Sequence, residues 1–349
     1  MSTPVTTKPP DTADTRPQRS LASRILTRPE FGAIAAAIVI FIFFFAVAPP
    51  FRTLPAFGTV LYASSTIGIV AVGVALLMIG GEFDLSAGVA VVTSALVAAL
   101  TCFQLSLNVW VGVLVALVVS LGVGFLNGYL VVKTGIPSFL ITLATFFSLR
   151  GINLAVTKGI TGTVASDNIS ELDGFASAKA IFASDIPLGF MNIKITVLWW
   201  LVFTALASWI LLRTRTGNWI FAVGGNAASA RAVGVPVPKV KIGLFMTVGF
   251  FAWFTGMQLL FVQNGVVQSG EGVGKEFLYI IAAVVGGCLL TGGYGSVVGA
   301  AVGALIFGMV QLGVVYAGWN PDWFKAFLGV MLLLATIVNL VVKNRAEAR

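Results

Sequence analysis

The stretch NVWVGVLVALVVSLGVGFLNGYLVV, residues 108–132, contains no charged residue and is long enough to cross the hydrocarbon core of a bilayer as one helix. Nine further apolar stretches flank it along the chain. We expect membrane spans at 31–48, 58–79, 88–106, 108–132, 137–156, 195–212, 242–262, 277–291, 296–316 and 326–342. The sequence therefore predicts an all-α polytopic membrane protein with about ten transmembrane helices.

The overall composition supports this fold class. Of 349 residues, 58% are hydrophobic and only 10% are charged, too few polar residues to cover the surface of a soluble protein. Residues 1–30 are instead rich in Pro, Thr, Ser and Arg, without apolar periodicity. We expect 1–30 to be a disordered cytoplasmic tail and 31–349 to be a single transmembrane domain, with an outer segment at 157–194 and a long inner loop at 213–241.

The distribution of charge predicts the orientation in the membrane. An even number of spans places both termini on the same side. If that side is the cytoplasm, the excess of Lys and Arg lies in the inner segments, as the positive-inside rule requires. The formal net charge of +8 is then an orientation signal, and no nucleic-acid partner is expected.

Several chemistries are excluded by the residues that are missing. The chain has no histidine, so it has no histidine base, no Ser-His-Asp triad and no histidine-ligated metal. Cys102 and Cys288 are far apart in apolar runs and predict buried packing residues. A phosphate-binding P-loop is also lacking from the sequence. No catalytic residue, metal site or cofactor is expected, and any ATP hydrolysis belongs to a separate subunit.

The inner loop contains GGNAASARAVGVPVPKVK, residues 224–241. Asn226 is a good helix N-cap, and Gly234 can adopt the left-handed conformation that ends a helix. The pattern predicts a helix of about two turns that lies outside the bilayer and is flanked by basic residues. A simple connector needs only about 2–8 residues. A docking element is therefore favoured over a connector.

A second unusual segment is GGEFDLSAG, residues 80–88. Glu82 and Asp84 lie between apolar spans and have no basic neighbour in the sequence, and a carboxylate at bilayer depth is costly. The glycines permit a broken helix that lines a cavity. The alternative is a cytoplasmic turn in which Asp84 or Ser86 caps the next span. Both interpretations stay open, and Glu82 is expected to be the more dispensable carboxylate.

Polar side chains also occur inside the predicted spans. Thr142 and Thr145 favour interhelical hydrogen bonds over solute contact, whereas Asn127 fits either role. Arg150, near the end of its predicted span, is expected to reach the outer interface. The candidate translocation pathway or gate consists of Glu82, Asp84, Ser86, Asn127, Thr142 and Thr145.

Five segments, in order, resemble the permeases of the ribose, xylose and arabinose importers of the ATP-binding-cassette (ABC) class. They are GGEFDLSAG (80–88), NGYLVVKTGIPSFLITLATFFSLRG (127–151), GGNAASARAVGV (224–235), IIAAVVGGCLLTGGYGSVVGAAVGAL (280–305) and WFKAFLGVMLLLA (323–335). The resemblance covers most of the chain from about residue 60 onward. It implies a permease domain in the bacterial inner membrane that imports a monosaccharide or related polyol by alternating access.

The resemblance also implies partners and coupling residues. Such permeases form a dimer, here expected to be a homodimer. They work with a cytoplasmic ATPase that has two nucleotide-binding modules, and with a periplasmic sugar-binding protein. The positions that match the ATPase-coupling motif are Asn226, Ala230, Arg231 and Gly234.

Two other functions remain as alternatives. An ion-coupled secondary transporter of a small polar solute needs embedded carboxylates, for which Glu82 and Asp84 are the candidates. An intramembrane enzyme would need a base and a nucleophile, and the absence of histidine and of a nucleophile elbow argues against it.

Overall fold

A computed structural model describes residues 29–189 and 191–347, and most of this part of the chain is α-helical. The helices are α2 (Pro29–Val47), the 3-10 helix η1 (Pro49–Arg52), α3 (Leu54–Ile79), α4 (Ala87–Gln104), α5 (Val109–Thr134), α6 (Ser138–Thr161), α7 (Phe175–Phe182), α8 (Ile195–Arg213), α9 (Arg215–Gly225), α10 (Ala227–Ala232), α11 (Val237–Val262), α12 (Lys275–Val285), α13 (Val297–Tyr316) and α14 (Trp323–Glu347). The strands β1 (Asp185–Pro187) and β2 (Asn192–Lys194) pair antiparallel as a hairpin.

Within the described residues, eight helices are long and apolar enough to cross a membrane. They are α2, α3, α4, α5, α6, α8, α11 and α13. These helices coincide with eight of the expected spans. The last expected span, 326–342, falls within α14, whose apolar part is Trp323–Ile337.

The expected span at 277–291 is wrong. The helix there, α12, has 11 residues and ends at Val285. At 1.5 Å per residue it is about 16 Å long, roughly half the thickness of the hydrocarbon core. The apolar run continues past Val285, but Gly287, Gly292 and Gly293 have positive φ angles and turn the chain out of the helix. Hydropathy alone does not distinguish such an apolar loop from the end of a helix.

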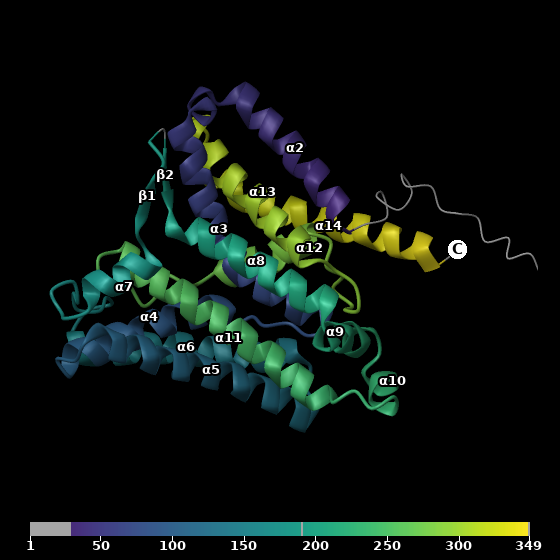
Figure 1. Cartoon of the computed structure of the whole chain (residues 1–349), viewed down its shortest axis with the longest axis horizontal. Coiled ribbons are helices and arrows are strands. Elements are labelled where there is room, and N and C mark those ends of the chain that lie inside the picture. Colours follow the sequence, from purple (N-terminus) through teal and green to yellow (C-terminus); the bar gives the residue numbers. More distant parts are fainter. Residues whose placement is uncertain (1–28, 190, 348–349) are drawn as a thin grey trace, which may run out of the picture.

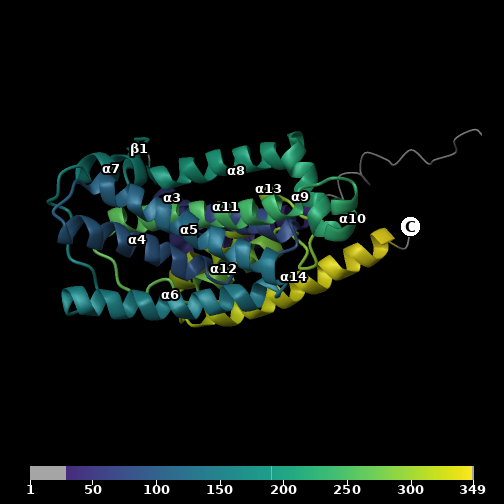
Figure 2. The same cartoon turned by 90° about the horizontal axis from the view of Figure 1, so that it is seen from below.

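The helices form one elongated bundle (Figures 1 and 2). One end carries α7 and the β-hairpin and is called the hairpin end here, while the other carries α9 and α10 and is called the α10 end. The interior consists mainly of α3, α4, α11 and α13, which are mostly buried, whereas α2, α5, α6 and α8 are more exposed. Helices α6 and α14 lie along one side of the bundle and α8 along the opposite side (Figure 2).

Candidate coupling and gate site

The predicted docking helix exists and is capped as expected. Asn226 Oδ1 accepts a hydrogen bond of 2.9 Å from the Ser229 amide at the start of α10. The helix ends at Ala232, and Gly234 follows with φ +85°. Ala230 is buried, whereas Arg231 is exposed. The capped helix is therefore confirmed, and one face of it is free at the α10 end.

The inner loop contains a second helix that the sequence analysis missed. Residues 215–225 form α9, and the Thr214 side chain accepts from the Gly217 amide at its start. Thr214 was the available signal, because Thr before a helical segment is a common N-cap. Helices α9 and α10 together explain why the loop is longer than a connector.

Three pairs of glycines meet where α9 ends, at positions 80–81, 224–225 and 292–293; we call this contact the glycine junction. A Cβ atom built on Gly224 would lie only 1.8 Å from the Ile79 carbonyl oxygen, and one on Gly292 would lie 2.6 Å from the Cα of Gly81. The Gly293 amide donates a 2.9 Å hydrogen bond to the same Ile79 carbonyl. We call the inner loop, residues 213–241, the coupling segment. Its backbone contacts the backbone at the end of α3 and in the α12–α13 connection.

A second link joins the coupling segment to the α3–α4 connection. Lys241, in the first turns of α11, forms an ion pair with Glu82. The side chains are 20% and 9% exposed, respectively, so the pair is largely shielded from water. Glu82 therefore has a basic partner that its sequence neighbours do not supply, and the expectation that it is the more dispensable carboxylate stays a prediction. The two residues are 159 positions apart in the sequence, and only the fold brings them together.

The α3–α4 connection lies inside the bundle. The Phe83 amide donates to Ser138 Oγ (3.0 Å), and the Leu85 amide donates to Thr142 Oγ1 (3.1 Å). Residues 83–85 thus run beside the first two turns of α6, a membrane-spanning helix. Residues 82–86 are therefore a largely buried, non-helical connection between the two candidate spans α3 and α4, and their role as a gate stays a prediction.

A buried hydrogen-bond network holds the α3–α4 connection in place. Asp84 Oδ1 accepts from the amide of Ser86 (2.7 Å) and from its hydroxyl (2.5 Å). Asn127 Nδ2 on α5 donates to Ser86 Oγ (3.0 Å), and Asn127 Oδ1 accepts from Thr145 Oγ1 on α6 (2.7 Å). The expectation that the Ser86 side chain caps α4 is wrong, because its oxygen accepts from Asn127 and from no amide at the start of α4.

The candidate pathway residues therefore gather in one place. Thr142 and Thr145 form hydrogen bonds between structural elements, as expected, and Asn127 connects α5 to both the α3–α4 connection and α6. The coupling residues Asn226, Ala230, Arg231 and Gly234 form a separate group, and the glycine junction and the Glu82–Lys241 pair lie between the two groups. Within residues 29–189 and 191–347, no three Cys, Asp or Glu side chains gather as metal ligands would.

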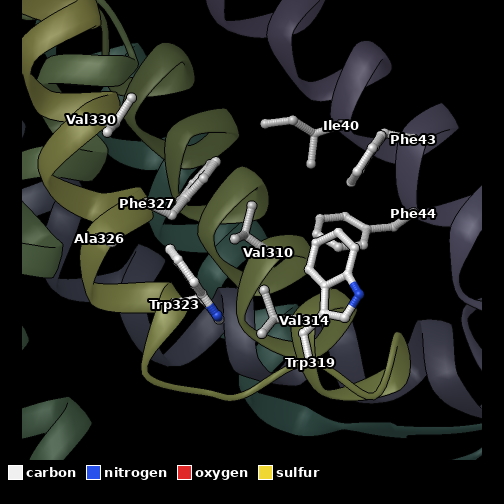
Figure 3. A pocket seen from close by; sticks show the side chains of 10 residues that line it. All are labelled: Ile40, Phe43, Phe44, Val310, Val314, Trp319, Trp323, Ala326, Phe327 and Val330. Atoms are coloured by element: carbon white, nitrogen blue, oxygen red, sulfur yellow. The ribbon is translucent and has the colours of Figure 1, made fainter.

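A groove of about 710 Å³ between α2, α13 and α14 is of a different kind (Figure 3). Its lining residues are aliphatic or aromatic: Ile40, Phe43, Phe44, Val310, Val314, Trp319, Trp323, Ala326, Phe327 and Val330. It contains none of the candidate residues, and it lacks the hydroxyl, amide and charged groups that bind polar solutes.

The sequence matches the family described as "Branched-chain amino acid transport system / permease component" over residues 56–336. The ribose import permease of Escherichia coli (strain K12) is 30% identical over 308 residues, which cover 88% of this chain and 92% of the relative. A probable ABC transporter permease of the same strain is 33% identical, covering 91% of each chain. The galactose/methyl galactoside import permease of Haemophilus influenzae is 30% identical, covering 83% of this chain and 88% of the relative.

No solved structure matches the chain. The family match nevertheless spans most of the sequence, including the α3–α4 connection, the glycine junction and α10. Relatives of nearly the same length are at least 30% identical to it. The chain therefore belongs to this family of transport-system permease components and is a multi-pass protein of the inner membrane.

Proposed function

We propose that the chain is the membrane subunit of an ABC importer and moves a monosaccharide or a related polyol into the cell by alternating access. The relatives that import ribose and galactose support this solute class. The observation that carries the proposal is the continuous contact from α10, through the glycine junction, to the α3–α4 connection at 80–86. A cytoplasmic ATPase with two nucleotide-binding modules is the proposed partner of α10.

The contacts indicate how force from the ATPase reaches the gate. A displacement of α10 moves the end of α9, where Gly224 touches the carbonyl of Ile79 without intervening side chains. Backbone atoms in van der Waals contact cannot absorb such a movement by changing rotamers. At the other end of the coupling segment, Lys241 holds Glu82. Both ends of the coupling segment therefore move the α3–α4 connection together with its buried hydrogen-bond network.

The two ends of the bundle suit different partners. The α10 end is also where α2 begins and α14 ends (Figure 1), which supports the proposal that both termini lie in the cytoplasm. The hairpin end then faces the periplasm, where α7 and the β-hairpin offer a surface to a sugar-binding protein. We assign a second copy of the chain to the exposed side of α6, where small residues allow close helix packing.

The coupling role is tested by two substitutions and one matched control. Gly234→Val introduces a β-branched residue at φ +85° and should misdirect the chain after α10. A Cβ there meets no atom within 4 Å, so Gly234→Asn, which tolerates the left-handed region, serves as the control. Arg231→Glu should place the wrong charge in the contact and weaken ATPase binding by about 2–5 kcal/mol if that contact is desolvated.

The measurements are co-purification of the ATPase and ATP hydrolysis stimulated by the loaded binding protein. Gly234→Val and Arg231→Glu should lose both while inserting normally, and Gly234→Asn should keep both. Inactivation of the P-loop lysine in the ATPase should abolish uptake, and dissipation of the proton gradient at constant ATP should not. Uptake that follows the proton gradient instead would identify an ion-coupled transporter.

A further inference from the structure

Helix α6 carries a charge at its midpoint. Arg150 lies 12 residues after Ser138 and 11 before Thr161, about 18 Å and 16 Å from the two helix ends at 1.5 Å per residue. The expected span ended at residue 156, whereas α6 continues to Thr161, which leaves more helix between Arg150 and the hairpin end than the expected span allowed. Neither edge of a hydrocarbon core about 30 Å thick is within easy reach of its side chain.

Contacts on either side show where Arg150 lies along the bundle. Toward the α10 end, Leu85 is bonded to Thr142, and toward the hairpin end, Asn153 donates to Thr93 on α4 (3.1 Å). Between these two levels, α4 passes the start of α12. A Cβ atom built on Gly88 would lie 2.5 Å from Glu276 Oε2. The half-length helix α12 therefore begins at the middle of the bundle, at the level of Arg150.

Glu276 is the acidic residue that interacts electrostatically with Arg150. It is 3% exposed, and both of its carboxylate oxygens accept from the Gly274 amide at 3.1 Å. The positive charge of Arg150 interacts electrostatically with this carboxylate. Among the described residues, however, Arg150 has no ion pair within 4 Å and no side-chain hydrogen bond. Glu276 stabilises the charge of Arg150 without occupying its N–H groups.

An exposed arginine with five free donors is costly against lipid. Water or a polar solute would satisfy those donors. We propose that the face of α6 around Arg150 lines a water-filled path at the middle of the membrane, and that Arg150 donates hydrogen bonds there to the hydroxyl groups of the transported solute. This inference rests on the proposed import function and assigns its solute contact.

The charges define the class of solute. A guanidinium presents a planar fork of donors that fits two neighbouring hydroxyl oxygens. Arg150 interacts electrostatically with the carboxyl group of Glu276, so it is not an isolated positive charge of the kind that selects anions. A neutral polyhydroxylated solute with adjacent hydroxyls fits this arrangement. An amino acid, with its charged ammonium and carboxylate groups, fits it less well.

The water-filled path is tested by thiol labelling in the complete complex during ATP turnover. Cys102 and Cys288 are replaced by alanine, and Phe147→Cys is introduced one turn before Arg150, at a position 60% exposed. The control is Leu206→Cys on α8, which is 51% exposed on the opposite side of the bundle (Figure 2). A charged, membrane-impermeant thiosulfonate should label the Phe147→Cys variant at least about tenfold faster, because thiolates form in water and not in lipid. Equally slow labelling of both variants would overturn the proposal.

The solute contact is tested by the ratio of solute imported to ATP hydrolysed. Arg150→Gln should lower this ratio by about tenfold or more, the effect of losing a charged hydrogen bond. Arg150→Lys should be intermediate, because it keeps the charge but not the fork. Lys158→Gln, on the same helix near its end, is the control and should leave the ratio unchanged.

ATP hydrolysis stimulated by the binding protein separates this inference from the function on which it rests. It should be preserved in Arg150→Gln. Stimulation lost in Arg150→Gln alone would show a structural role for Arg150, and an unchanged import ratio would show no role in transport; either result overturns the inference. Absence of stimulation in the wild-type complex would instead overturn the proposed function.

Discussion

At the scale of single residues, Glu82 and Lys241 join two parts of the chain that have different roles. Lys241 is the last residue of the coupling segment, and Glu82 belongs to the α3–α4 connection. An ion pair exposed on a protein surface contributes little, but removing one partner of a shielded pair leaves an uncompensated charge in a poorly solvated place. The pair therefore stabilises the structure and also transmits movement.

We expect Glu82→Lys and Lys241→Glu each to lower the melting temperature and the rate of uptake. The double variant, which restores opposite charges, should recover much of both. The interaction energy in this double-mutant cycle should be about 0.5–3 kcal/mol. Thermal unfolding of the purified protein and uptake in vesicles provide the measurements. Lys239→Glu, at an exposed position two residues away, is the control and should have little effect. Strictly additive effects of the two substitutions would argue against the link.

Residue roles set by the local sequence could be predicted, and those set by distant contacts could not. Asn226 and Gly234 cap and end a helix through their own backbone neighbours, so their roles follow from composition and spacing. The partner of Glu82 depends on how α11 docks against the α3–α4 connection. Ser86 looked like a cap, but in the folded chain its hydroxyl oxygen accepts from Asn127 on α5 instead.

At the scale of helices, the glycine junction determines how closely the coupling segment can approach α3. Gly224 and Gly225 are adjacent residues of α9 with opposite environments. A Cβ on Gly224 would collide with the Ile79 carbonyl at 1.8 Å, whereas one on Gly225 meets no atom within 4 Å. The chain thus supplies its own matched control for the importance of this contact.

We expect Gly224→Ala to force the backbones apart and to destabilise the protein by about 1–3 kcal/mol or more, since overpacking cannot be relieved by a side-chain rotation. Uptake should fall with it. Gly225→Ala should be close to wild type in melting temperature and transport. Similar behaviour of the two variants, in either direction, would show that the junction does not transmit movement.

Helices with long, continuous apolar sequences were predictable, whereas interrupted ones were not. Residues 108–132 contain enough apolar length to identify α5 directly. The run at 277–291 was mistaken for a full span because apolar loop residues follow α12 without a polar boundary. The unusual character of the α3–α4 connection could be suspected from its glycines and carboxylates, but its position beside α6 became clear only from the hydrogen bonds to Ser138 and Thr142.

At the scale of the whole molecule, the exposed side of α6 bears on assembly. Small residues recur on this side at positions that share one face of a helix, and all are exposed: Ala144, Ser148, Gly151, Ala155 and Gly159. Small residues let helix backbones approach closely in a bilayer. Arg150 is one residue, about 100° around the helix, from Gly151. A second copy seated on the small residues would therefore place Arg150 beside the seam between two chains.

We expect Gly151→Leu to keep the two copies apart and to shift the protein from dimer to monomer. A Cβ at Gly151 meets nothing within 4 Å in the single chain, so the substitution should not disturb the fold. Gly122→Leu on α5 is the control, because that glycine is also exposed and equally free of neighbours. Native mass spectrometry in mild detergent and crosslinking in membranes measure the oligomeric state. A dimer that persists in the Gly151→Leu variant would place the interface elsewhere.

The short length of α12 has a consequence for how the protein is made. A segment of 11 residues cannot be recognised by a membrane insertion machinery that selects stretches of about 20 apolar residues. Its entry into the bilayer must therefore depend on the helices that pack against it. Helix α13 is the nearest candidate, because Gly286 and Gly299 pack backbone against backbone, as do Ala282 and Gly303. Nascent chains that stop before α13 should therefore leave α12 outside the membrane, and its insertion should coincide with the synthesis of α13.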